Sequence, residues 1–294
     1  MSERSANITI PVDLTNPGQF FACCGMLELA NRLWAGAEGR FDREHFFIAG
    51  SPECSLSRLL DHLSKSAVRN TMTPDETTRL EQLTSMTKGQ REKTAGLEEE
   101  KKDLESRRRE LPIVLTGAVE LHIDWFRDEF AGGSRFKTWA GQQSVLDIAV
   151  AMHRGMDHVV NGDSSQLWRD VRGLDLPFNF DSDLGAQGSA LDIGFSFDPL
   201  AGSEATRIRG TCRPTLELLC FIGLQRFRPQ EIRRQNRFVY IAWSTYLPPC
   251  VASAVACGAV GIADGFPHEF KLLYRTKYLK SFLPAIPFQG DLDE

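Results

Sequence analysis

The sequence predicts an α+β fold, in which a mixed or antiparallel sheet packs against helices and carries a charged helical insertion. The 294 residues are 42% apolar and 25% charged, a balance typical of a soluble globular chain. Strand-like and helix-like segments follow one another irregularly, without the βαβ repetition of a doubly wound sheet. We expect residues 1–65 and 112–294 to form the core and residues 66–111 to form the insertion.

The N-terminal part of the core is expected to run strand, helix, strand, helix. Apolar alternation and helical spacing predict these elements over 8–12, 19–34, 45–48 and 56–63. Gly25 lies inside the longer helix, where glycine costs about 1 kcal/mol relative to alanine. A glycine at this position therefore predicts close contact with another backbone.

The expected insertion differs sharply in composition from its surroundings. Residues 88–110 contain eight basic and seven acidic side chains. Leu83, Leu97, Leu104 and Leu111 fall on one heptad register, although the partner positions of that register are polar. We interpret the segment as an exposed charged helix, one arm of a helical hairpin.

The remainder of the core mixes further strands and helices. Alternating apolar residues and β-rich runs predict strands over 119–125, 191–198, 237–243 and 268–278. Helical spacing predicts one helix that begins after Ser144 and another over 214–227, which has a proline near its first turn.

Positive charge is concentrated near the C-terminus. The chain carries a net charge of −5, yet residues 207–280 hold twelve basic and four acidic side chains, a net +8. Arginine binds phosphate bidentately and stacks on bases, so this Arg-rich region predicts contact with nucleic acid. Alternatively, these groups pair with acidic residues of the same chain or of another subunit. The candidate residues are Arg207, Arg209, Arg213, Arg226, Arg228, Arg233, Arg234, Arg237, Arg275 and Lys277.

A Gly-rich loop is the second candidate site. Its glycines allow backbone N–H groups to approach a ligand closely, and its side chains supply charge, neutral donors and a stacking face. It lacks the pattern of a phosphate-binding P-loop. The alternative is a connecting loop that Phe136 and Trp139 anchor in the core. The candidate residues are Gly132, Gly133, Ser134, Arg135, Lys137, Thr138, Trp139, Gln142 and Gln143.

Sequence signatures of catalytic, metal-binding and cofactor-binding sites are weak, so we expect no catalytic site, no bound metal and no cofactor. An acid–base role for His122 or His153 stays open as an alternative. Asp181 and Asp183 follow turn residues and are expected in a solvated loop.

The seven cysteines show no C-x-x-C spacing and stand mostly among apolar neighbours, which indicates core packing in a reducing cytoplasm. We expect no membrane span.

Two segments carry a resemblance to a known family. Ile10–Ala30 (IPVDLTNPGQFFACCGMLELA) and Gly132–Ser144 (GGSRFKTWAGQQS) resemble CRISPR-associated proteins of type I-G loci, formerly type I-U. That family is regarded as a compact, large-subunit-like component of a Cascade-type surveillance complex. The resemblance implies guide RNA, target DNA and other effector-complex subunits as partners. It does not imply catalysis, because cleavage in these systems belongs to a separate helicase–nuclease. The chain is short for a large subunit.

The leading hypothesis is a non-catalytic subunit of an RNA-guided surveillance complex that contacts guide RNA or target DNA near the protospacer flank. In such recognition, base pairing reads most of the sequence, and protein reads a short flanking duplex and backbone shape. Two alternatives stay open: an endoribonuclease that processes repeat RNA, and a structural adaptor whose basic region docks on an acidic partner protein.

Overall fold

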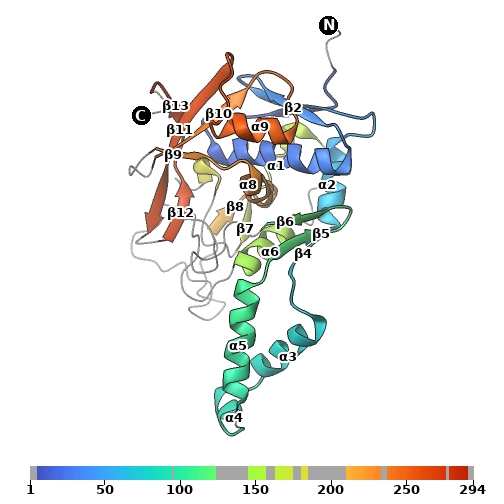
Figure 1. Cartoon of the computed structure of the whole chain (residues 1–294), viewed down its shortest axis with the longest axis vertical. Helices are drawn as coiled ribbons and strands as arrows, with labels where there is room; N and C mark the ends of the chain where they lie inside the picture. The colour runs from blue at the N-terminus through green and yellow to red at the C-terminus, as the bar shows by residue number, and fades with distance from the viewer. Residues whose placement is uncertain are drawn as a thin grey trace.

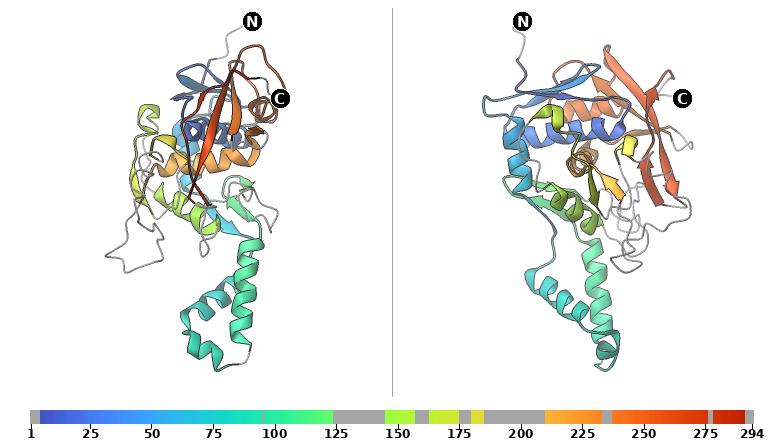
Figure 2. Two further views of the ribbon diagram at one scale, coloured as in Figure 1. Left: turned by 90° about the vertical axis from the view of Figure 1, so that its left-hand side faces the viewer. Right: turned by 180° about the vertical axis from the view of Figure 1, so that it is seen from behind.

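The computed structural model describes residues 5–94, 96–123, 145–156, 163–174, 180–184, 210–232, 237–275 and 278–290. Within these ranges helices pack against antiparallel sheets, which confirms the predicted α+β fold. Figure 1 shows a body of helices and strands from which an arm of helices extends, and Figure 2 shows the same arm from two further sides.

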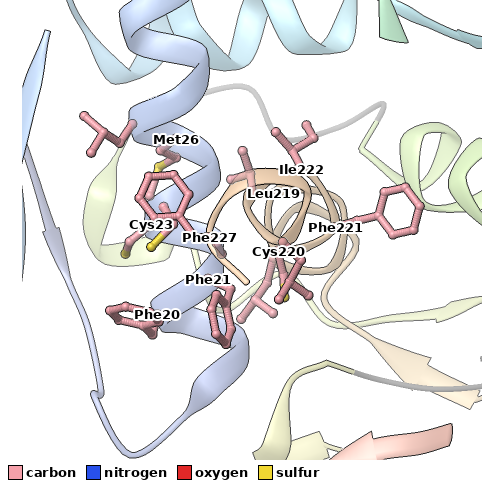
Figure 3. Packing of buried hydrophobic residues seen from close by; sticks show 14 of the residues in the cluster. Phe20, Phe21, Cys23, Met26, Leu219, Cys220, Phe221, Ile222 and Phe227 are labelled. Atoms are coloured by element: carbon pink, nitrogen blue, oxygen red, sulfur yellow. The ribbon is translucent and has the colours of Figure 1, made fainter. Parts of the chain in front are cut away.

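Two helices form the centre of the body, α1 (Pro17–Leu33) and α8 (Pro214–Arg226). Both are apolar on nearly all sides, and both are therefore buried over most of their length. Figure 3 shows their side chains packed together where the helices meet. A Cβ atom on Gly223 would lie only 2.8 Å from the backbone nitrogen of Gly25. The close backbone contact predicted at Gly25 is confirmed, and α8 provides it.

The first antiparallel sheet covers α1 and has the order β1 (Ile8–Pro11), β3 (His45–Ala49), β2 (Glu38–Phe41). Its inner face packs on the helix, where the rings of Phe20 and Phe41 stack with centroids 5.1 Å apart. A backbone bridge between Gly39 and Leu247, with N–O distances of 2.9 and 3.0 Å, extends the edge of β2. The sheet therefore has one buried face and one outer face.

A second antiparallel sheet, formed by the C-terminal part of the chain, packs at the N-terminal end of α1, where the ring centroids of Phe21 and Phe270 are 6.2 Å apart (Figure 1). The indole N–H of Trp243 donates to the carbonyl of Gly39 at 2.7 Å, and Tyr240 donates to the carbonyl of Leu14, so this sheet is tied to the N-terminal segment. Its strands are β12 (Tyr278–Phe282), β11 (Gly265–Arg275), β10 (Arg237–Trp243) and β9 (Gln230–Ile232), with β13 (Ile286–Pro287) paired to β11, and helix α9 (Pro249–Ala256) packs on β10.

The arm is an insertion between two paired strands. Strands β4 (Ala67–Asn70) and β5 (Ile113–Thr116) are antiparallel neighbours, and Asn70 pairs with Ile113 at the base of the arm. The arm itself consists of α3 (Pro74–Ser85), α4 (Lys88–Glu92) and α5 (Leu97–Glu110). It has a small apolar core of its own, in which Leu80, Leu83 and Leu104 are buried.

One predicted element of the arm is wrong in its extent. The charged run over 88–110 forms two helices, α4 and α5, rather than one. Gly96 adopts φ +88°, a left-handed conformation that glycine tolerates and that interrupts a right-handed helix. Capping boxes at Thr73 and Thr87 begin the shorter helices α3 and α4.

The remaining described elements surround the centre. Helix α6 (Val145–Gly155) packs on α8 and on β4, and the indole N–H of Trp168 donates to the carbonyl of Pro11 at 2.7 Å. The full set of elements around the centre is α2 (Leu56–Ser64), β6 (Glu120–His122), α6 (Val145–Gly155), η2 (Ser164–Gln166), β7 (Arg172–Leu174) and β8 (Gly210–Cys212) within the described residues. The strand predicted over 191–198 lies outside the described residues.

The cysteines behave largely as core residues. All seven are free thiols, and five of them are buried. Burial raises the pKa of the Cys23 and Cys24 thiols well above the usual value, so neither is a ready nucleophile. None of the helices in the described ranges has an apolar stretch long enough to cross a membrane.

Candidate nucleic-acid interface

Much of the predicted interface lies outside the described residues. This holds for the whole Gly-rich loop, Gly132–Gln143, and for Arg207, Arg209, Arg233, Arg234 and Lys277. Arg275 ends strand β11. Four residues of the Arg-rich region are described with their side chains: Arg213, Arg226, Arg228 and Arg237.

Three of these four arginines form ion pairs within the chain. Arg213 pairs with Asp181, and Arg237 pairs with Glu269. Arg226 pairs with Glu28 at 2.5 Å. At these three positions the structure has the intramolecular pairing that the sequence left open. The carboxylates lie 32 to 198 residues away along the chain, so charge counted along the sequence did not reveal them.

The pair at Arg226 belongs to a larger charged cluster. The Glu28 carboxylate of α1, whose side chain is only 4% exposed, accepts from the Nε of Arg32 at 2.7 Å and from the Nε and Nη2 of Arg226 at 2.5 and 3.2 Å. Glu28 and Arg32 stand one helical turn apart. Two guanidinium groups therefore share the Glu28 carboxylate, so this hydrogen-bonded cluster has one surplus positive charge, while Glu120 contributes a negative charge nearby.

These groups border an open cavity of about 280 Å³. Strand β6 forms its other wall, and the Nη1 of Arg32 donates to the carbonyl of Glu120 at 3.2 Å. The Arg32 and Arg226 side chains keep 36% and 39% of their surface exposed. The lining residues of this Arg32–Arg226 cavity are Glu28, Arg32, Glu120, Leu121, His122, Gln225 and Arg226.

Sequence reasoning identified only part of this cavity. Arg226 was predicted from the charge distribution, and His122 from its place on the polar face of a strand. Glu28 and Arg32 were missed. The signal that could have revealed them is the carboxylate of Glu28 inside the apolar run of α1. A charge buried among apolar residues requires a partner, so an arginine beside it could be expected.

Arg213 lies in a second, buried polar cluster. Glu217 of α8 is fully buried and accepts from the backbone N–H groups of Phe180 at 2.8 Å and Asp181 at 3.2 Å. Burial raises the pKa of Glu217 to about 8, although these hydrogen bonds oppose the shift. The Asp181 carboxylate accepts from the Asn16 amide at 2.8 Å and from Arg213. The cluster holds segment 180–184 against the beginnings of α1 and α8.

The prediction of a solvated loop at Asp181 is therefore wrong. Its side chain is fully buried because Asn16, Arg213 and a backbone N–H group compensate its polar atoms. Asp183 is partly exposed, and Arg213 lies 3.9 Å from its carboxylate. Burial is the main factor that raises the pKa of Asp183.

The two candidate histidines differ in their surroundings. The Nε2 of His153 lies 3.0 Å from the carbonyl of Leu63 and 3.2 Å from the Ser66 hydroxyl, so this ring connects α6 to the end of α2. His122 is exposed and lines the Arg32–Arg226 cavity. Across the described part of the chain, no group of three or more metal-ligating side chains is arranged to hold an ion.

Comparison of the chain with protein-family models, with curated protein sequences and with solved structures finds no match.

Proposed function

We propose that the chain is a non-catalytic subunit of a type I CRISPR surveillance complex, where it contacts guide RNA or target DNA near the protospacer flank and neighbouring subunits. Two lines support the proposal: the resemblance at Ile10–Ala30 and Gly132–Ser144, and the chemistry of the Arg32–Arg226 cavity. The observation that carries it is that two half-exposed guanidinium groups share one buried carboxylate at an open cavity.

A nucleic-acid phosphate fits this arrangement. The surplus positive charge at Arg32 and Arg226 is complemented by a phosphodiester, and guanidinium groups bind phosphate oxygens in a planar, bidentate manner. Glu28 holds both guanidinium groups in place before a ligand arrives, which reduces the entropy lost on binding. The chain as a whole is acidic, so contact with nucleic acid is expected at such local sites rather than over the entire surface.

Binding of labelled oligonucleotides to the full chain, followed by fluorescence anisotropy over a salt series, tests the proposal. Arg32→Gln and Arg226→Gln are prepared as separate variants, because each leaves Glu28 with one ion-pair partner. Arg58→Gln is the matched control, since Arg58 is an exposed arginine on α2. For single strands we expect each cavity variant to bind more weakly and to lower the salt slope by about 0.7 per lost phosphate contact.

Comparison with the Arg58→Gln control gives the result that would contradict the assignment of the cavity. Equal affinities and salt slopes for Arg58→Gln and the two cavity variants would remove the cavity from the interface. Failure of the wild-type chain to bind single-stranded RNA, single-stranded DNA or duplex DNA would contradict the proposal itself.

One observation favours a second function, the processing of repeat RNA. His122 lines the same cavity as Arg32 and Arg226, so a potential proton donor or acceptor lies beside groups suited to phosphate. Incubation of the chain with repeat RNA in EDTA separates the two functions. A surveillance subunit leaves the RNA intact, whereas a nuclease cleaves it without metal and loses that activity in His122→Ala.

A further inference from the structure

The outer face of the first sheet carries a cation that lies over aromatic side chains. Phe47 of β3 lies opposite Arg40 of β2 and Thr9 of β1 in the strand register, so the three residues share one row and one face. The guanidinium carbon of Arg40 lies 4.1 Å from the centre of the Phe47 ring and 5.2 Å from the centre of the Tyr246 ring. We call Arg40, His45, Phe47 and Tyr246 the Arg40 platform.

Backbone pairing fixes the platform from two sides. Tyr246 precedes Leu247, which bridges to Gly39 at the edge of β2 and so brings the tyrosine beside Arg40. His45 stands two residues before Phe47 on the same strand, and their rings are 6.0 Å apart. Opposite these residues, the inner face of the sheet is buried, so the platform rests on the core of the protein.

The charge of Arg40 is balanced differently from that of the arginines in the Arg-rich region. Arg213, Arg226 and Arg237 all pair with carboxylates. Among the described residues no carboxylate forms an ion pair with Arg40, and its guanidinium group lies over the two aromatic rings. A guanidinium stacked on an aromatic ring keeps its N–H groups available for an anion, and its plane remains suited to stacking.

We propose that the Arg40 platform binds unpaired bases of a single-stranded nucleic acid. Aromatic rings and guanidinium planes stack on bases of any sequence, and the same cation attracts the neighbouring phosphate. A duplex does not satisfy this surface, because its bases are already stacked on one another. The inference rests on the proposed function and adds a second contact, one that reads bases rather than phosphates, at a site separate from the Arg32–Arg226 cavity.

The test compares three labelled twelve-nucleotide probes of equal charge: oligo-U RNA, oligo-dT DNA and an abasic DNA. Phe47→Leu and Tyr246→Leu keep apolar bulk but remove an aromatic ring, and Arg40→Lys keeps the charge but removes the plane. Lys102→Gln, an exposed change on the arm, is the control. Thermal unfolding of every variant checks that the fold is kept, and Arg40→Lys serves where the leucine variants unfold early.

We expect Phe47→Leu and Arg40→Lys to weaken binding of oligo-U, oligo-dT or both by roughly tenfold. The probe whose affinity falls more shows whether the ligand is RNA or DNA. Neither variant should change binding of the abasic probe, whereas Arg226→Gln should weaken all three. The platform is excluded if Phe47→Leu and Arg40→Lys bind base-carrying probes as tightly as Lys102→Gln does, while Arg226→Gln still weakens them. If the wild-type chain binds none of the three probes, the platform proposal is overturned, and the proposed function falls with it if duplex DNA does not bind either.

Discussion

Gly25 of α1 and Gly223 of α8 meet backbone to backbone where the two central helices cross. Neither position has room for a Cβ atom, since one on Gly223 would lie 2.8 Å from the Gly25 nitrogen and one on Gly25 would lie 2.9 Å from the Leu219 carbonyl carbon. Glu28 and Arg226 each stand three residues beyond these glycines. The close crossing therefore places the carboxylate and the guanidinium within hydrogen-bond distance and forms one wall of the Arg32–Arg226 cavity.

Substitution of Gly223 by alanine should destabilise the protein. The added methyl group would push against the backbone of α1, and overpacking of this kind costs about 1–3 kcal/mol in the free energy of unfolding. Chemical denaturation measures the change. Gly89→Ala in α4 is the control, because no atom beyond its own turn of helix lies within 4 Å of an added Cβ, and there alanine should be neutral or stabilising. Equal stability of Gly223→Ala and wild type would show that the helices do not cross this closely.

The buried Glu217 predicts a pH dependence of stability. Its pKa is about 8 in the folded chain against an ordinary value of 4.5, so the folded state binds the extra proton between these limits. Stability from this group is therefore fully present below about pH 4.5 and falls as the pH rises to 8. We expect the difference in unfolding free energy between wild type and Glu217→Gln to decline over that range. A difference that stays constant with pH would contradict the raised pKa.

Removal of the arm should leave the body folded. Asn70 and Ile113 are paired neighbours, and the apolar core of the arm is separate from that of the body. We expect replacement of residues 72–111 by Asn-Gly, which forms a tight hairpin turn, to shift the thermal midpoint by only a few degrees. The ion pair lost between Arg108 and Asp147 is partly exposed and contributes about 0–1 kcal/mol. If the protein no longer unfolds cooperatively after the arm is excised, the arm is an integral part of the core.

Local patterns in the sequence predicted the elements that are buried over most of their length. Helix α1, helix α8 and strand β10 were predicted close to their observed bounds, because their apolar residues dominate the segment. Strands β2, β4 and β5 and helices α3 and α9 were not identified. Strand β2 contains Glu38, Gly39 and Arg40 and is held by its pairing with β3, while β4 and β5 pair across the whole arm. Such tertiary pairing overrides weak local propensity.

The candidate site was less predictable than the fold. A charge excess along the Arg-rich region gave no indication that Glu28, Asp181 and Glu269 would lie beside Arg226, Arg213 and Arg237. Ion pairs depend on the meeting of distant segments, and a single sequence contains no record of which segments meet. The Arg40 platform was missed for the same reason, because a backbone bridge at Leu247 brings Tyr246 to the edge of β2.

Ultraviolet crosslinking with peptide mapping shows whether the chain touches nucleic acid through the Arg32–Arg226 cavity and the Arg40 platform. The full chain is irradiated with single-stranded RNA, single-stranded DNA and duplex DNA in separate reactions. We expect crosslinked peptides from α1 and the end of α8, around Arg32 and Arg226, and from strands β2 and β3, around Arg40 and Phe47. Crosslinks confined to other surfaces, or none with any of the three nucleic acids, would contradict the account.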